Sequence, residues 1–134
     1  MSSFSESPII PIHYFLSDTI LKFFSSVENA AKFNADLSTW SVERVFDMAY
    51  MFHGASSFNS NLASWNVSSL IDMSSMFSAA TSFRQNLCDW GVFLDTSALV
   101  MEAFNETACP RMDDPNLNMT PPDLFCFSCE EVLI

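Results

Sequence analysis

The sequence predicts an α/β solenoid with a parallel ladder of strands on one side, short helices on the other and an irregular cysteine-containing tail. Three observations predict it: a 25-residue repeat, a change of apolar periodicity inside each repeat, and an apolar composition. Hydrophobic residues make up 49% of the 134 residues and charged residues only 16%, so a packed interior is expected. A fixed period in this range is typical of units that stack on one another.

Four residue types carry the repeat. Each occurs three times at 25-residue intervals: Phe33, Phe58 and Phe83; Leu37, Leu62 and Leu87; Trp40, Trp65 and Trp90; Val42, Val67 and Val92. Five further positions recur once: Val45, Met48, Met51, Phe52 and Ala55 return as Leu70, Met73, Met76, Phe77 and Ala80. Burying the large apolar side chains of one unit would contribute roughly 12–24 kcal/mol, whereas ordering its backbone costs on the order of 25–50 kcal/mol. A unit therefore needs neighbours in order to fold.

The chain divides into three segments. Residues 1–29 do not match the repeat, and the apolar spacing over residues 20–31 predicts a helix that caps the open end of the stack. Residues 30–108 hold about three repeat units. Residues 109–134 form a tail that is rich in cysteine and proline.

Within one unit the apolar period changes. Residues 39–43 alternate between polar and apolar, which predicts a short strand. Apolar residues over 45–55 are three or four apart, which predicts a helix. Asn34 and Asn59 follow the repeated phenylalanine, and we expect their side chains to bond their own backbone in turns.

The third unit departs from the period. Its last apolar positions lie two residues late relative to the second unit, which indicates a two-residue insertion between Val92 and Val100. Arg84 stands where the first two units have asparagine. We therefore expect the array to end near this point.

The charge balance excludes several function classes. The formal net charge is −11, and the five basic residues are scattered, so no patch is available to neutralise phosphates and nucleic-acid binding is not expected. The same charge repels an anionic membrane surface. No apolar run reaches the roughly 20 residues of a membrane-spanning helix. The N-terminus does not resemble a secretory signal, which fits an intracellular protein or a fragment of a longer chain.

The repeated pattern Phe-Asn-x-x-Leu-x-x-Trp-x-Val-x-x-Val/Leu-x-Asp-Met-x-x-Met-Phe-x-x-Ala resembles one known family. It is similar to the BspA-like leucine-rich-repeat surface proteins, in the variant of roughly 25 residues found in bacterial lipoproteins and marine protist proteins. Residues 33–55 and 58–80 match throughout, 83–107 match in part, and the cysteine-bearing end also resembles the protist members. The resemblance implies a curved leucine-rich-repeat solenoid at the cell surface or outside the cell, with no catalytic residues.

The four cysteines are the first candidate site. They are disulfide candidates if the compartment is oxidising, and three connectivities are open. Cys88 and Cys109 are a plausible pair, because the tail must return to the last unit. Cys126 and Cys129 form a C-x-x-C motif, for which redox chemistry or half a zinc site is an alternative, and inert thiols are another.

Three Asn-x-Ser/Thr motifs, at Asn66, Asn105 and Asn118, are glycosylation candidates. The excess of acidic residues is most simply a solvated surface; calcium binding by Asp113 and Asp114 is the weaker alternative, because no full ligand loop is present. We expect no metal and no cofactor.

The outer face of the expected strands is the candidate binding surface. It comprises Thr39, Ser41 and Glu43, then Ser64, Asn66 and Ser68, and continues with Asp89, Gly91 and Phe93. A protein or glycan partner would bind there. No nucleophile, base and orienting group converge in the sequence, so we do not expect an enzyme.

These observations predict a non-catalytic binding or adhesion module at the cell surface or outside the cell. A part of a longer repeat array is one form that such a module can take. The alternatives are a structural role, as a spacer or a cap at the end of a larger surface protein, and an intracellular protein-interaction scaffold.

Overall fold

The structure is a computed structural model that describes residues 30–119 and 122–129. Among these residues there are three regular elements: the 3-10 helix η4 (Cys88–Val92) and the strands β1 (Leu124–Phe125) and β2 (Phe127–Ser128). The two strands pair antiparallel in a small hairpin. The helix expected over residues 20–31 lies almost wholly outside the described part of the chain.

The predicted α/β solenoid with a strand ladder and short helices is wrong. The described residues form neither a strand over 39–43 nor a helix over 45–55. Parallel pairing is limited to two isolated bridges, one between Asp47 and Asp72 and one between Asp72 and Leu99. Each unit is instead an irregular coil built from tight turns.

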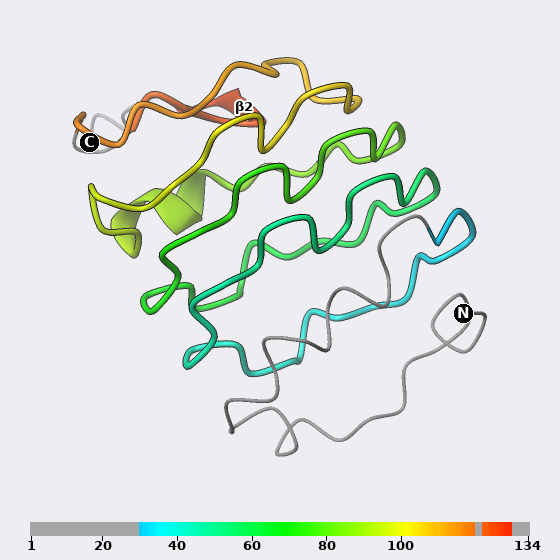
Figure 1. Cartoon of the computed structure of the whole chain (residues 1–134), viewed down its shortest axis with the longest axis horizontal. Helices are drawn as coiled ribbons and strands as arrows, with labels where there is room; N and C mark the ends of the chain where they lie inside the picture. Colours follow the sequence, from blue (N-terminus) through cyan, green and yellow to red (C-terminus); the bar gives the residue numbers. More distant parts are fainter. Residues whose placement is uncertain (1–29, 120–121, 130–134) are drawn as a thin grey trace, which may run out of the picture.

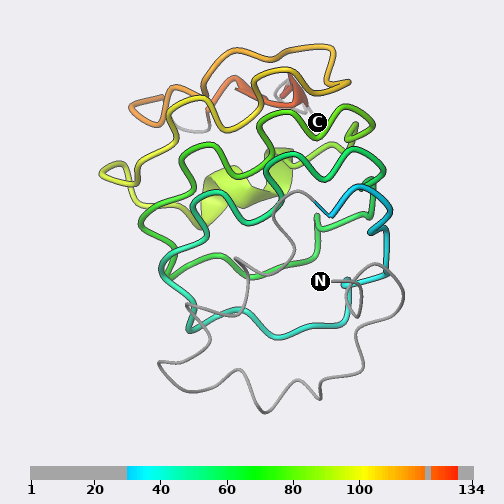
Figure 2. The ribbon, with the colours of Figure 1, turned by 45° about the vertical axis from the view of Figure 1, so that its right-hand side comes forward.

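Successive coils lie over one another, and the views in Figures 1 and 2 agree on this. We name the units by the repeated phenylalanine with which each begins: coil 1 (33–57), coil 2 (58–82) and coil 3 (83–108). Backbone hydrogen bonds join the coils along one edge, which we call the turn edge (residues 46–55, 71–80 and 98–106). From coil 1, these bonds run from Met48 N to Asp72 O (2.8 Å), Tyr50 N to Ser74 O (3.1 Å), Phe52 N to Met76 O (2.8 Å) and Gly54 N to Ser78 O (2.9 Å).

Along the turn edge, every second amide of coil 1 donates to coil 2, and every second amide of coil 2 likewise donates to coil 3. The bonds run from Met73 N to Leu99 O (2.8 Å), Ser75 N to Met101 O (2.9 Å), Phe77 N to Ala103 O (2.9 Å) and Ala79 N to Asn105 O (2.8 Å). The two isolated bridges are 25 and 27 residues apart in sequence (72 − 47 and 99 − 72). The predicted two-residue insertion in the third unit is therefore confirmed, and η4 ends at Val92, where the segment with the insertion begins.

Consecutive turns explain why the helical spacing misled the prediction. In a helix every amide bonds the carbonyl four residues earlier. Here Met51 N bonds Met48 O and Ala55 N bonds Phe52 O, both at the three-residue distance of a turn. The third residue of each turn has positive φ, at 63° for Tyr50 and 74° for Gly54, as a type II turn requires. Turns three or four residues apart give the same apolar spacing as a helix.

A prediction follows from Ala79, which is the repeat counterpart of Gly54 and has a φ of 62°. Ala79→Gly should raise the free energy of unfolding by about 0.5–1 kcal/mol. Relief of roughly 1–2 kcal/mol of left-handed strain outweighs the roughly 0.4–1 kcal/mol of added unfolded-chain entropy. Gly54→Ala is the matched control and should lower it by a similar amount. Urea unfolding measures both, and the opposite signs would contradict the turn geometry.

Two columns of stacked phenylalanine rings fill the interior. Phe33, Phe58 and Phe83 stack with centroids 5.7 and 5.8 Å apart. The second column, Phe52, Phe77 and Phe104, has spacings of 5.6 and 5.6 Å. The two columns are in contact, because the ring centroids of Phe52 and Phe58 lie 3.9 Å apart and those of Phe77 and Phe83 lie 4.1 Å apart. The repeat therefore places like ring over like ring in a fully buried core.

The tryptophans add a hydrogen bond between coils. Trp65 and Trp90 stack at 6.3 Å with nearly parallel rings. The indole Nε1 of Trp65 donates to Leu37 O (2.8 Å), and that of Trp90 donates to Leu62 O (2.9 Å). A buried indole N–H needs such a partner, so Trp65 and Trp90 are each tied to the leucine of the preceding coil.

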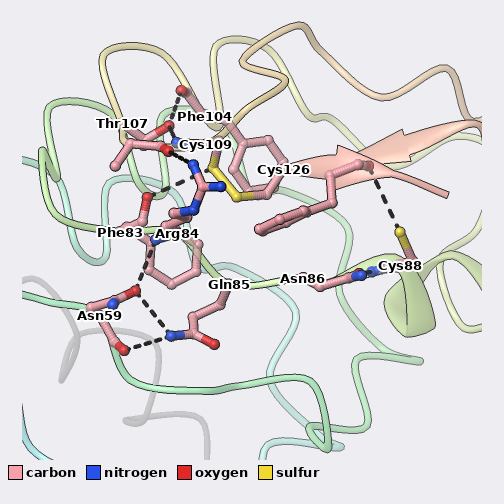
Figure 3. Close-up of a disulfide and its surroundings, with 12 residues drawn as sticks. Asn59, Phe83, Arg84, Gln85, Asn86, Cys88, Phe104, Thr107, Cys109 and Cys126 are labelled. Carbon is pink, nitrogen blue, oxygen red and sulfur yellow. Dashed lines mark hydrogen bonds between the residues drawn. A yellow bond between two sulfur atoms is a disulfide. The ribbon is translucent and has the colours of Figure 1, made fainter.

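The repeated asparagines also link coils, and the expectation that they bond their own backbone is wrong. Asn34 Oδ1 accepts from Asn59 N (2.7 Å), and Asn59 Oδ1 accepts from Arg84 N (2.8 Å). Gln85 Nε2 also donates to Asn59 Oδ1 (3.0 Å), as Figure 3 shows. The side chain takes the position that a carbonyl would hold in a regular ladder.

Asn59→Leu should therefore lower the free energy of unfolding by about 1 kcal/mol, because it removes the acceptor of two hydrogen bonds at a solvent-exposed site. Asn59→Asp is the matched control, since a carboxylate still accepts from Arg84 N, and it should be close to neutral. Thermal unfolding of both variants tests this. Equal losses would show that the acceptor oxygen is not what the fold requires.

The tail covers the coil 3 end of the stack (Figure 2). Phe125 packs edge-on against Phe104 at 6.2 Å and is fully buried. Asp114 Oδ1 accepts from Glu102 N (2.8 Å), at the position where the amides of Tyr50 and Ser75 donate to the next coil. The carboxylate of Asp114 thus replaces the carbonyl of a following coil and ends the ladder.

Two further features bear on the tail. A Cβ on Gly91 would lie 2.9 Å from Cδ of Pro122, so only glycine lets the tail approach η4 this closely. Val92 was expected inside with Val42 and Val67, but it is 75% exposed. It lies in η4, where the third unit departs from the other two.

Candidate functional site

The predicted binding face is not a strand surface. Thr39, Glu43, Ser64 and Ser68 are exposed and Ser41 and Asn66 are half-buried, but none belongs to a strand. The strand-face interpretation is therefore wrong. Ser64 Oγ donates to Ser38 O of the preceding coil (3.2 Å), so this side of the molecule is tied together by its own polar groups.

An open polar groove of about 530 Å³ crosses this side. It is lined by Asp36, Ser38, Ser60, Asn61, Ala63, Ser64 and Asp89. Asp36 Oδ1 accepts from Ser38 N (2.9 Å), and this backbone hydrogen bond lowers the pKa of the Asp36 carboxyl below its ordinary value. The groove offers hydroxyls, an amide and two carboxylates. It can form hydrogen bonds, but it presents no aromatic or arginine anchor of the kind that dominates interface energy.

Of the positions predicted for coil 3, Asp89 lines the groove. Gly91 packs against Pro122, and Phe93 is 39% exposed at the end of η4. The structure therefore brings Ser64 and Asp89 together in one groove, and the other predicted residues do not line it.

All four cysteines are in disulfides. Cys88 pairs with Cys129, and Cys109 pairs with Cys126. The expected Cys88–Cys109 pair is wrong. The C-x-x-C alternatives are wrong as well, because Cys126 and Cys129 each bond a different partner. Figure 3 shows the Cys109–Cys126 bridge beside Phe83 and Phe104.

The Cys88–Cys129 disulfide fastens the tail to coil 3, and the Cys109–Cys126 disulfide ties the hairpin of β1 and β2 to the first residue of the tail, directly after coil 3. Cys88 lies at the start of η4, and Cys126 lies between β1 and β2. Arg84 adds to the contact, since its guanidinium lies 5.3 Å from the ring centre of Phe127 and donates to Ala108 O (3.3 Å). The tail is thus held covalently on the last coil of the stack.

Asp114 takes part in the cap described above, through Glu102 N. Among residues 30–119 and 122–129, no cluster of three or more His, Cys, Asp or Glu residues is arranged to hold a metal ion. No helix in this part of the chain is long and apolar enough to cross a membrane.

Comparison with protein families matches residues 5–110 to DUF285, described as a Mycoplasma protein of unknown function. The chain belongs to the DUF285 family. The match begins before the repeat and ends near the start of the tail, so it takes in most of the first segment. No curated protein and no solved structure matches this DUF285 chain.

The three sequons of this DUF285 chain lie in different environments. Asn66 is half-buried, and its Oδ1 accepts from Ser68 N (3.0 Å). Asn105 and Asn118 are exposed. Asn105 follows Phe104 in a turn whose Thr107 hydroxyl donates to Phe104 O (2.7 Å). Glycosylation of these residues stays a prediction.

Sequence reasoning missed one surface of the DUF285 chain. Five apolar side chains on the turn edge are 40–67% exposed: Phe46, Tyr50, Ile71, Leu99 and Met101. A signal was present, because Phe46 and Ile71 each follow a buried repeat position, Val45 and Leu70, and so create two adjacent apolar residues. A helix or strand that packs on one side cannot bury both members of such a pair, because adjacent side chains point in different directions. Both pairs lie where the apolar spacing predicts a helix, and Phe46 and Ile71 are not among its repeated apolar positions.

Proposed function

We propose that this DUF285 chain is a non-catalytic binding or adhesion module that works at the cell surface or outside the cell. The two disulfides carry the proposal. Paired cysteines persist in oxidising compartments and are rare in reducing ones, and here all four cysteines are paired. The resemblance of the repeat to BspA-like surface proteins supports the same location.

The architecture also favours binding. The coils are cross-linked by backbone, asparagine and tryptophan hydrogen bonds, so outward side chains are held on a rigid frame. Repeat scaffolds commonly present extended binding surfaces in this way. The groove residues bond one another and the backbone, as Ser64 does with Ser38 O, and this arrangement suits recognition better than chemistry.

The compartment is tested by alkylating free thiols in the intact cells that make the protein, before lysis, and then measuring the protein and its peptides by mass spectrometry. We expect no blocked cysteine and the peptide pairs Cys88–Cys129 and Cys109–Cys126. Four blocked cysteines would overturn the proposed location, because they would place the protein in a reducing compartment.

The binding role is tested by attachment. Cells that lack the gene should attach less well to their natural surface than cells that carry it, and added purified chain should compete for attachment. A variant without residues 58–82 removes one coil and keeps the register, and it should compete less well. Unchanged attachment without the gene would overturn the adhesion role, and full competition by the shortened chain would favour a spacer.

A further inference from the structure

The exposed apolar residues of the turn edge form a surface of their own. We call Phe46, Tyr50, Ile71, Leu99 and Met101 the apolar edge; they are 40%, 50%, 53%, 57% and 67% exposed, respectively. Their neighbours in sequence, such as Val45 and Met48, are fully buried. Single exposed apolar residues are ordinary, but several that gather on one edge indicate an interaction site.

Backbone hydrogen bonds make the apolar edge continuous over three coils. Ile71 N donates to Phe46 O (2.9 Å), and Leu99 N donates to Ile71 O (2.9 Å). Chains paired in this manner lie about 4.8 Å apart, so side chains on neighbouring coils are close enough to touch one ligand. Because these bonds fix the backbone, little ordering entropy would be lost on binding.

The turn edge, taken with the three residues before each of its segments, is strongly acidic. Over residues 43–55, 68–80 and 95–106, Arg44 is the one lysine or arginine. Six acidic residues stand against it: Glu43, Asp47, Asp72, Asp95, Glu102 and Glu106. Asp47 and Asp72 each accept a hydrogen bond from the amide two residues later, at 3.0 and 2.9 Å, which fixes both carboxylates at the positions that follow Phe46 and Ile71 in sequence.

We propose that the apolar edge docks a basic protein segment in which lysine or arginine alternates with aliphatic residues. The inference rests on the proposed binding function and names the partner's chemistry. Apolar side chains would cover Ile71 and Leu99, while cations would face Asp47 and Asp72. Charge complementarity selects this occupant. A second copy of a chain with net charge −11, a nucleic acid and an anionic membrane would each be repelled.

The probe is a labelled octapeptide of alternating lysine and leucine, titrated with the full oxidised chain by fluorescence anisotropy. Two reference peptides carry lysine with serine and glutamate with leucine. We expect the lysine–leucine peptide to bind at least about tenfold more tightly than either reference, and its binding to weaken as salt is added. Equal binding of the lysine–serine peptide would overturn the proposal, because charge alone would explain it.

Variants locate the site. Ile71→Ser with Leu99→Ser should weaken peptide binding about tenfold or more. The matched control is Val92→Ser, at a 75% exposed residue of η4, and it should bind as the wild type does. Asp47→Asn with Asp72→Asn keeps the turn acceptors and should also weaken binding. Equal affinity of the wild type and the serine variant would overturn the proposal.

Light scattering of the free chain tests the competing occupant. We expect a monomer for the wild type and for the serine variant. A dimer that Ile71→Ser with Leu99→Ser abolishes would overturn the proposal in favour of a second copy. Failure here is distinct from failure of the proposed function: oxidised cysteines and gene-dependent attachment without peptide binding would reject the apolar edge alone.

Discussion

Replacing Cys88 and Cys129 together by alanine should lower the free energy of unfolding by about 4 kcal/mol. The bridge closes a loop with a sequence separation of 41 residues, and the entropy removed from the unfolded chain by a loop of this size corresponds to roughly 4 kcal/mol. For a domain of 134 residues this is a large share of the typical total of about 5–15 kcal/mol. Urea unfolding followed by tryptophan fluorescence measures the loss.

The second bridge supplies the matched control. Cys109 and Cys126 are 17 residues apart, so replacing both by alanine should cost less, about 3 kcal/mol. The tail should detach first when Cys88 and Cys129 are replaced, because that bridge is the one that joins it to coil 3. A loss below about 1 kcal/mol for both pairs would show that the disulfides do not hold the cap.

Phe77→Ala should lower the free energy of unfolding by about 3–5 kcal/mol, the usual cost of removing a buried phenylalanine. Phe77 is the centre of the aromatic core, where it stacks on Phe52 and Phe104 within its own column and on Phe83 in the other. Its exposure is 0%. Removal would leave a cavity between three coils that cannot close without shifting the hydrogen-bonded turn edge.

Phe46→Ala is the control for this prediction. It removes the same atoms from a side chain that is 40% exposed, so the loss should stay within about 0.5–1 kcal/mol. Denaturant unfolding of both variants in the oxidised state gives the comparison. Similar losses for the two would contradict the column of stacked rings.

The sequence predicts the repeat and its register well, because burial imposes both. The residues in phase at 25-residue intervals are those that stack or cross-link the coils, such as Phe58 and Trp65. The two-residue insertion in the third unit follows from the same register. Val92 is in register but exposed, unlike Val42 and Val67, because it lies in η4, which turns its side chain outward.

The local conformation could not be predicted from apolar spacing. A helix and a series of tight turns place apolar residues at similar intervals, and only backbone φ distinguishes them. Gly54 hints at a positive φ, but Tyr50 and Ser75 adopt one without any sequence signal. Their strain is offset by hydrogen bonds to the next coil, which are not visible in one unit alone.

The candidate site was predicted less well than the fold's register. Pairing of the cysteines depends on how the hairpin of β1 and β2 lies over coil 3, which spacing along the chain does not determine. The apolar edge was hidden for a related reason. The helical spacing over residues 45–55 marks Val45, Met48 and Met51 as buried and gives no role to Phe46, which is 40% exposed in the coil.

Scalar couplings across hydrogen bonds, measured by NMR on isotope-labelled oxidised protein, test the stacked coils most directly. The account predicts couplings from the amide nitrogen of Phe52 to the carbonyl carbon of Met76, and from that of Phe77 to the carbonyl of Ala103. Couplings from Phe52 to Met48 and from Phe77 to Met73, the four-residue pattern of a helix, would contradict it.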